Sequence, residues 1–218
     1  LHTAYRRQRQ MCIRDSITGV NLYIITKLRL MLRFYYTVSS GYNSPQSKVS
    51  DSLGGYKSST LVPNDVFGNL FDEISLNLAS NPHSQYVALV LKNEGTETLK
   101  NVELWFSSVT NNPYGTITVG AIGMGKDEEE NPVTSRTSSI NEKPYWIQFH
   151  EAKEEEPVSL GDMEAGKEIC LWFCRSLDKE IIKNDYDLVA ERDMNTQNRY
   201  KKVGKQTEEI FNINLLWE

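Results

Sequence analysis

The chain has 218 residues, of which 39% are hydrophobic, and its formal net charge at pH 7 is −5. This length allows one domain with a sizeable core, in which about 70% of the unfolded surface is buried. The acidic balance argues against a phosphate-binding surface, because neutralising phosphates requires clustered lysine and arginine. We therefore expect no nucleic-acid partner.

The first part of the chain differs in character from the rest. Residues 1–16 resemble one translated frame of a transposon-type sequencing adapter, and Met31 is the best candidate start. We expect residues 1–30 to be a non-native leader, made of adapter and upstream read-through. The alternative is that residues 17–30 form a genuine first strand. The leader carries a formal charge of +5, so residues 31–218 alone carry −10.

We expect no membrane segment. Residues 22–36 include Lys27, Arg29 and Arg33, and their unbroken apolar runs are far too short to cross a bilayer. We also find no apolar signal-peptide core that ends in small residues.

Short apolar segments separated by turn residues dominate residues 31–218. We expect strands or extended segments, in chain order, at residues 32–39, 52–60, 86–91, 102–106, 116–122, 145–149, 169–173 and 210–217. Residues 64–75 predict a short helical turn that plugs one end of the core. In the last strand, alternation places four residues inward and two outward. The inward set is Phe211, Ile213, Leu215 and Trp217, and the outward set is Asn212 and Asn214.

The connections also carry predictions. Residues 92–101 are expected to reverse the chain as a hairpin-like unit, and residues 158–168 to form a tight connection. Residues 177–194 have poor helical spacing and predict an excursion between the last two core strands. The acidic clusters at residues 126–130 and 151–156 fall in predicted loops.

Together these segments predict an all-β fold, an antiparallel β-sandwich. We expect a single domain over residues 64–218, preceded by a strand and an extended arm over residues 31–63. The competing class is α+β, for which residues 177–194 supply the one candidate helix.

Cys170 and Cys174 are the two cysteines outside the leader. On a strand they would lie on one face about 13 Å apart, which is too far for a disulfide. We expect two small core residues rather than a bridge or a zinc pair.

Two parts of the sequence resemble immunoglobulin-like sandwiches. Residues 86–106 resemble the second and third core strands of such domains, where an Asn-x-Gly reversal joins an apolar strand to one that begins Asn-Val. Residues 160–173 resemble an edge of the same folds, at which a glycine accepts a positive φ before the next strand. The resemblance implies an immunoglobulin-like fold.

The order of the motifs is similar to that of tailed-bacteriophage virion structural proteins. It includes residues 69–74 and 117–121 together with the two segments above. In addition, residues 34–43 resemble sequences of crAss-like phages. The resemblance covers about residues 64–175 and brings no catalytic residue. It implies a virion location, with other virion proteins or a second copy of the chain as partners.

We expect no catalytic residue, no cofactor site and no metal site. His83 lies in an Asn-Pro-His-Ser segment that predicts an exposed turn, and His150 ends a predicted strand beside an acidic loop. Residues 120–125 are only superficially similar to a dinucleotide loop, since no helix follows to present N–H groups. Residues 127–130 lack the alternating spacing of a calcium loop, so solvated charge is favoured. The chain is therefore predicted not to be an enzyme.

Aromatic residues leave one alternative open. Trp105, Trp146, Trp172 and Trp217 all fall in predicted strands, where core packing is favoured over an exposed sugar-binding face. Four arm tyrosines are harder to bury together and are expected to line a subunit contact, namely Tyr35, Tyr36, Tyr42 and Tyr56. We expect a non-enzymatic virion structural protein of the head, neck or tail; the alternative is a bacterial surface or carbohydrate-binding β-sandwich.

Overall fold

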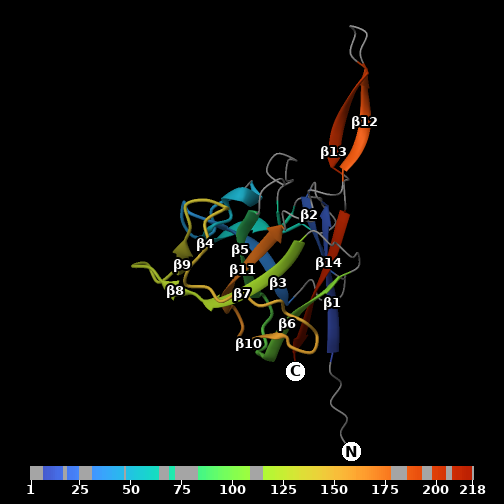
Figure 1. Ribbon diagram of the computed structural model, residues 1–218. Coiled ribbons are helices and arrows are strands. Elements are labelled where there is room, and N and C mark those ends of the chain that lie inside the picture. Colours follow the sequence, from blue (N-terminus) through green and yellow to red (C-terminus); the bar gives the residue numbers. More distant parts are fainter. Residues whose placement is uncertain are drawn as a thin grey trace, which may run out of the picture.

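The computed structural model describes residues 7–16, 19–24, 31–46, 48–63, 69–71, 83–108, 115–177, 186–192, 198–204 and 208–217. Within these ranges the chain is nearly all β, with strands β1 to β14 and one short 3-10 turn, η1 (Val49–Asp51). The antiparallel sheets are arranged as a sandwich (Figure 1). The predicted all-β sandwich is confirmed.

Two sheets form the body of the protein. The five-stranded sheet has the order β10 (Val158–Met163), β6 (Leu99–Ser108), β14 (Glu208–Trp217), β1 (Arg7–Ser16) and β2 (Gly19–Ile24). The seven-stranded sheet has the order β7 (Gly115–Gly123), β11 (Glu168–Leu177), β5 (His83–Asn93), β3 (Leu32–Val38), β4 (Gly54–Leu61), β9 (Pro132–Arg136) and β8 (Gly125–Lys126). Strands β1 and β2 lie within the expected leader. Their pairing does not test whether that segment is native, which stays a prediction.

A hydrophobic core fills the space between the two sheets. Alternate residues of β5 and β11 point into it, as period-two geometry requires. These are Val87, Leu89 and Leu91 on β5 and Ile169, Leu171 and Phe173 on β11. The five-stranded sheet adds Val102, Leu104, Ile213, Leu215 and Trp217, so the inward prediction is confirmed for the last three. Phe211 and Asn212 lie outside the residues whose side chains are described.

Strands β5 and β11 are also buried on their opposite, outer faces. Tyr86 and Ala88 of β5 cluster there with Cys170, Trp172 and Cys174 of β11, under a cover that includes Ile147. Burial on both faces explains why these two strands are nearly continuous apolar runs rather than alternating ones. Both cysteines are free and buried, as predicted.

The predicted hairpin at residues 92–101 is wrong. Strand β5 pairs with β11 and β3, whereas β6 pairs with β10 and β14, so the connection crosses from one sheet to the other. Asn93 stabilises the connection between the two sheets. Its side-chain Nδ2 donates hydrogen bonds to the backbone oxygens of Glu97 (2.8 Å) and Met163 (2.9 Å). The asparagine thus reverses the chain without a strand-to-strand ladder.

Two other predicted elements change type. Residues 145–149 form a turn and an irregular segment, with one bridge from His150 to Val119. Residues 158–163, expected as a connection, form β10, and the following turn places Gly166 at φ 79° as the resemblance implied. Ile147 is buried and Trp146 and Phe149 are half-buried as a cover over the sheet, and this packing needs no strand ladder.

Burial bears on two further expectations. Asn214 alternates with the inward Ile213 and Leu215, as predicted, but it is only 3% exposed, so its side of β14 is covered as well. Of residues 64–75, the structure describes 69–71, where Leu70 and Phe71 are fully buried in the core. Burial in the core is therefore confirmed for these two residues, but residues 69–71 form a bend rather than a helical turn, and the rest of residues 64–75 lies outside the described residues.

The sequence predicts that residues 177–194 leave the core. Residues 186–192, which the structure describes, form a strand outside the two main sheets. Strands β12 (Tyr186–Arg192) and β13 (Asn198–Gly204) pair antiparallel in a separate two-stranded sheet. Figure 1 shows this hairpin extending away from both sheets of the body.

The two-sided burial of β11 predicts a large response to truncation. Leu171→Ala should lower the free energy of unfolding by about 2–5 kcal/mol, because Leu171 is fully buried in the inter-sheet core. Leu61→Ala is the matched control, since Leu61 is 41% exposed. Urea unfolding followed by tryptophan fluorescence measures both, and equal losses in the two variants would contradict the packing described here.

Candidate functional site

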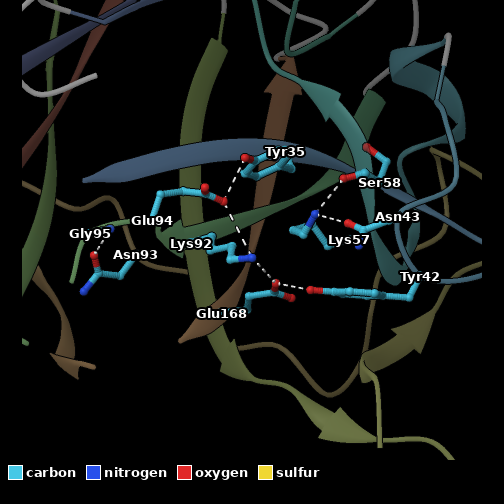
Figure 2. A network of polar contacts seen from close by, with 10 residues as sticks. All are labelled: Tyr35, Tyr42, Asn43, Lys57, Ser58, Lys92, Asn93, Glu94, Gly95 and Glu168. Carbon is cyan, nitrogen blue, oxygen red and sulfur yellow. Dashed lines mark hydrogen bonds and ion pairs between the residues drawn. The ribbon is translucent and has the colours of Figure 1, made fainter. Parts of the chain in front are cut away.

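A group of polar side chains occupies the outer face of the seven-stranded sheet, beside the apolar patch on β5 and β11. We call it the Lys57 cluster. Its members are Tyr35, Tyr42, Asn43, Lys57, Lys92, Glu94 and Glu168, and Figure 2 shows them converging from β3, β4, β5, β11 and the segment that follows β3.

Strand alternation places these residues on one face. Phe34 and Tyr36 of β3 point into the inter-sheet core, so Tyr35 between them points outward. Lys92 and Glu168 are paired in register on β5 and β11. After β3 the chain turns back along β4, and the Asn43 N–H donates to the Lys57 oxygen at 2.8 Å.

Lys57 is the centre of the cluster and is 4% exposed. Its Nζ lies 4.3 Å from the centroid of the Tyr35 ring and 5.1 Å from that of the Tyr42 ring. It donates hydrogen bonds to Asn43 Oδ1 and to the Ser58 oxygen. The rings stabilise an ammonium through cation–π attraction, which is stronger where water is excluded.

Burial nevertheless works against the charge on Lys57. Desolvation lowers the pKa of its ammonium, and the nearby positive charge of Lys92 lowers it further, against opposing effects of Glu168 and Glu94. A larger fraction of Lys57 is therefore a neutral amine than in an exposed lysine.

Two carboxylates and two tyrosines border Lys57. Tyr42 donates to Glu168 Oε1 at 2.6 Å, and Tyr35 donates to Glu94 Oε1 at 2.9 Å. Lys92 Nζ lies between the carboxylates, 3.4 Å from Glu168 and 3.6 Å from Glu94. The Glu168 side chain is 2% exposed, and its Oε2 has no hydrogen-bond partner among the described residues.

A separate cavity of about 670 Å³ lies between β7, β10 and the segment that covers the sheet. Trp146, Gln148, His150 and Glu151 contribute to its lining. Trp146 is half-buried, packed edge-on to Trp172 at 6.3 Å between ring centroids. The lining thus combines an aromatic side chain with polar and charged groups.

His83 and His150 lie apart from the Lys57 cluster. His83 is not in an exposed turn; it begins β5 and is half-buried, and desolvation followed by the charge of Arg175 lowers its pKa. Burial of the strand start accounts for the wrong prediction. His150 is exposed, and its backbone pairs with Val119 beside the cavity.

Residues 120–125 belong to strands rather than to a phosphate-binding loop. Gly120 lies within β7, where a Cβ would come within 2.4 Å of the Gln148 backbone oxygen. This glycine therefore allows the covering segment to approach the sheet. The segment of residues 120–125 continues into the short strand β8.

The acidic clusters lie in turns, as predicted. Asp127 Oδ1 accepts hydrogen bonds from the Glu129 and Asn131 N–H groups, both at 2.9 Å, and so caps its own turn. Across the described residues, no group of three or more His, Cys, Asp or Glu side chains is placed to hold a metal ion. No helix in the described chain is both long and apolar enough to cross a membrane.

The aromatic predictions hold in part. Trp105, Trp172 and Trp217 are buried, as core packing predicts, whereas Trp146 is half-buried. Among the arm tyrosines, Tyr35 and Tyr36 are buried within the protein, so the expected subunit contact is wrong for both. Tyr42 and Tyr56 are half-buried.

Sequence reasoning missed the polar members of the cluster. Lys57 lies in a short segment of glycine and serine residues that predicts a weak strand, and nothing there distinguishes it from an exposed lysine. The available signal was the set of nearby tyrosines, which the structure folds over the lysine. Tyr42 and Glu168 lie 126 positions apart in the sequence and are brought into hydrogen-bond contact only by the fold.

Comparisons with known proteins identify no relative. No family model, no curated protein and no solved structure matches this chain.

The tyrosines of the cluster predict a loss of stability at high pH. Burial, then the hydrogen bond to Glu94, raises the pKa of Tyr35 to about 12, whereas in the unfolded chain it is about 10. The folded protein keeps a proton that the unfolded chain loses, so the free energy of unfolding should fall as the pH rises from about 10 to 12. Urea unfolding across this range should show a shallower fall for Tyr35→Phe than for the unaltered chain.

Tyr145→Phe is the matched control for this measurement, because Tyr145 is 89% exposed. An identical decline in the Tyr35→Phe variant and the unaltered chain would show that the Tyr35 hydroxyl is not held as described.

Proposed function

We propose that this protein is a non-enzymatic structural component of a tailed-bacteriophage particle that contacts neighbouring virion proteins. The order of its sequence motifs, similar to that of tailed-bacteriophage virion proteins, supports the phage setting, as does the resemblance of residues 34–43 to sequences of crAss-like phages. The immunoglobulin-like character of residues 86–106 and 160–173 belongs to the same proposal, and the observed antiparallel sandwich is compatible with it.

The β12–β13 hairpin is the observation that carries the proposal. It extends from the body between β11 and β14, and its strands form a sheet of their own (Figure 1). An isolated two-stranded hairpin is marginally stable in water, so contact with another molecule would stabilise it. Its open edges offer backbone groups for strand addition by a neighbouring virion protein.

Replacing residues 184–206 by a short glycine-serine linker tests this role. The variant should keep the unfolding temperature of the unaltered chain, because the hairpin adds no strand to either sheet of the body. When co-expressed with the products of the adjacent genes, the full chain should co-purify with one of them and the variant should not. Substitution of alanine at Glu128 and Glu129, in an exposed turn, is the control that should leave binding unchanged.

The identity of those genes tests the phage setting independently. Portal, capsid or tail genes beside this one support the proposal, and a polysaccharide-utilisation cluster contradicts it. Binding by the hairpin variant equal to that of the full chain would remove the hairpin from the proposal.

Carbohydrate binding is the second candidate, favoured by one local feature. Tyr145 is almost fully exposed and packs edge-on to Trp146 at 4.8 Å between centroids. Trp146 in turn lines the cavity of about 670 Å³ together with Gln148 and Glu151. Aromatic side chains beside polar groups are suited to a sugar, which presents both apolar C–H faces and hydroxyls.

Titration calorimetry and a glycan array would test this candidate. Any glycan that binds the unaltered chain should bind about 5- to 30-fold more weakly to Trp146→Ala, which corresponds to the loss of an indole contact of about 1–2 kcal/mol. Lys100→Ala is the control, on the exposed surface of β6. No binding by the unaltered chain, or full binding by Trp146→Ala, would reject the candidate.

A further inference from the structure

The side chains of Lys57 and Asn43 are held against each other by more than one contact. Lys57 Nζ donates to Asn43 Oδ1, and the Asn43 N–H donates to the Lys57 backbone oxygen at 2.8 Å. Asn43 has a left-handed backbone with φ 60°, and its carboxamide oxygen contacts Lys57 of β4. The amine and the carboxamide are therefore positioned together before any reaction.

This position brings a nucleophile close to an electrophilic carbon. Asn43 Cγ is bonded to Oδ1 at about 1.23 Å, so the amine that contacts Oδ1 is also near Cγ. Desolvation lowers the pKa of Lys57 and increases the share of neutral amine, which is the form that attacks a carbonyl. Fixing the two groups in one geometry replaces a slow bimolecular amide exchange by an intramolecular one.

Glu168 supplies a carboxylate near Lys57, whose negative charge acts on the lysine amine. Lys57 Nζ lies over the ring of Tyr42, and the hydroxyl of the same ring donates to Glu168 Oε1. The other oxygen, Oε2, is buried without a hydrogen-bond partner among the described residues, which is costly for a carboxylate. Figure 2 shows Glu168 and Asn43 on the same side of the sheet as the amine.

We propose that Lys57 and Asn43 form an intramolecular isopeptide bond, with the Glu168 carboxylate carrying the proton. The bond from Lys57 Nζ to Asn43 Cγ forms, and the bond from Cγ to the side-chain nitrogen of Asn43 breaks. One amine proton moves by way of Glu168 to the departing nitrogen, which leaves as ammonia. No oxidant, reductant or other co-reactant is needed.

The bond joins the segment after β3 covalently to β4. It does not depend on the function proposed above, since it is a property of the chain alone. Its consequence is that the outer face of the seven-stranded sheet carries a permanent link that unfolding does not break.

Intact-mass spectrometry of the purified full chain is the first test. The expected mass is that of the sequence less one ammonia, also after denaturation. Lys57→Arg and Asn43→Ala should each show the full mass of their sequence. Lys100→Arg is the matched control and should keep the loss, because Lys100 forms an exposed ion pair with Asp162 rather than contacting an amide.

A tryptic digest then locates the bond. A branched peptide that contains both residue 43 and residue 57, with no cleavage after Lys57, is expected. Loss of ammonia that persists in Asn43→Ala would show a different source and overturn the proposal, as would the full sequence mass in the folded, unaltered chain.

Glu168→Gln tests the carboxylate separately. It should form the same bond about 100-fold more slowly, the scale expected when an acid–base group is removed, in a time course of mass after synthesis. The conversion rate of the unaltered chain should depend on pH, and this dependence should weaken in the variant. Conversion of Glu168→Gln at the unaltered rate would overturn the role assigned to this residue.

Discussion

The structure depends on the burial of β5 and β11 on both of their faces. On one side Leu89 and Leu171 lie in the inter-sheet core, and on the other Ala88 and Trp172 lie under the covering segment. The central part of the ladder between these strands is therefore shielded from water. These two closely packed strands form a rigid platform. The covering segment that contains Ile147 and the Lys57 cluster both lie on its outer face.

The platform also sets the chemistry of the outer face. Strand pairing ends the apolar patch at Lys92 and Glu168, which lie opposite each other, and the arm folds Tyr35 and Tyr42 over Lys57. Exclusion of water strengthens the cation–π contacts of the Lys57 ammonium with the two rings. The same exclusion lowers the pKa of that ammonium. Burial therefore gives Lys57 close ring contacts and, at the same time, a larger neutral fraction than an exposed lysine has. The hairpin β12–β13 extends beyond this platform, so a role in contacting partners and a reaction on the sheet face are physically separate.

Much of the fold was predictable because apolar alternation reports which face of a strand is buried. The continuous runs at residues 86–91 and 169–173 indicated strands, and the spacing of Cys170 and Cys174 indicated two free core residues. The same signal failed at residues 145–149, since apolar side chains gain as much from covering a sheet as from joining it. It also failed at residues 92–101, because a turn sequence does not say which strands pair on either side. The candidate site was less predictable still: Lys57, Asn43 and Glu168 carry no motif.

The sequence by itself determined that this chain is all β, that its cysteines are core residues and that its acidic segments lie in turns. These are local properties, set by side-chain periodicity and turn chemistry. The tertiary structure alone decided that residues 83–93 and 168–177 would be neighbours, that Tyr35 and Tyr42 would lie against Lys57, and that this lysine would contact Asn43 near the charge of Glu168. Such contacts arise from strand pairing across long stretches of chain, and no short-range pattern encodes them.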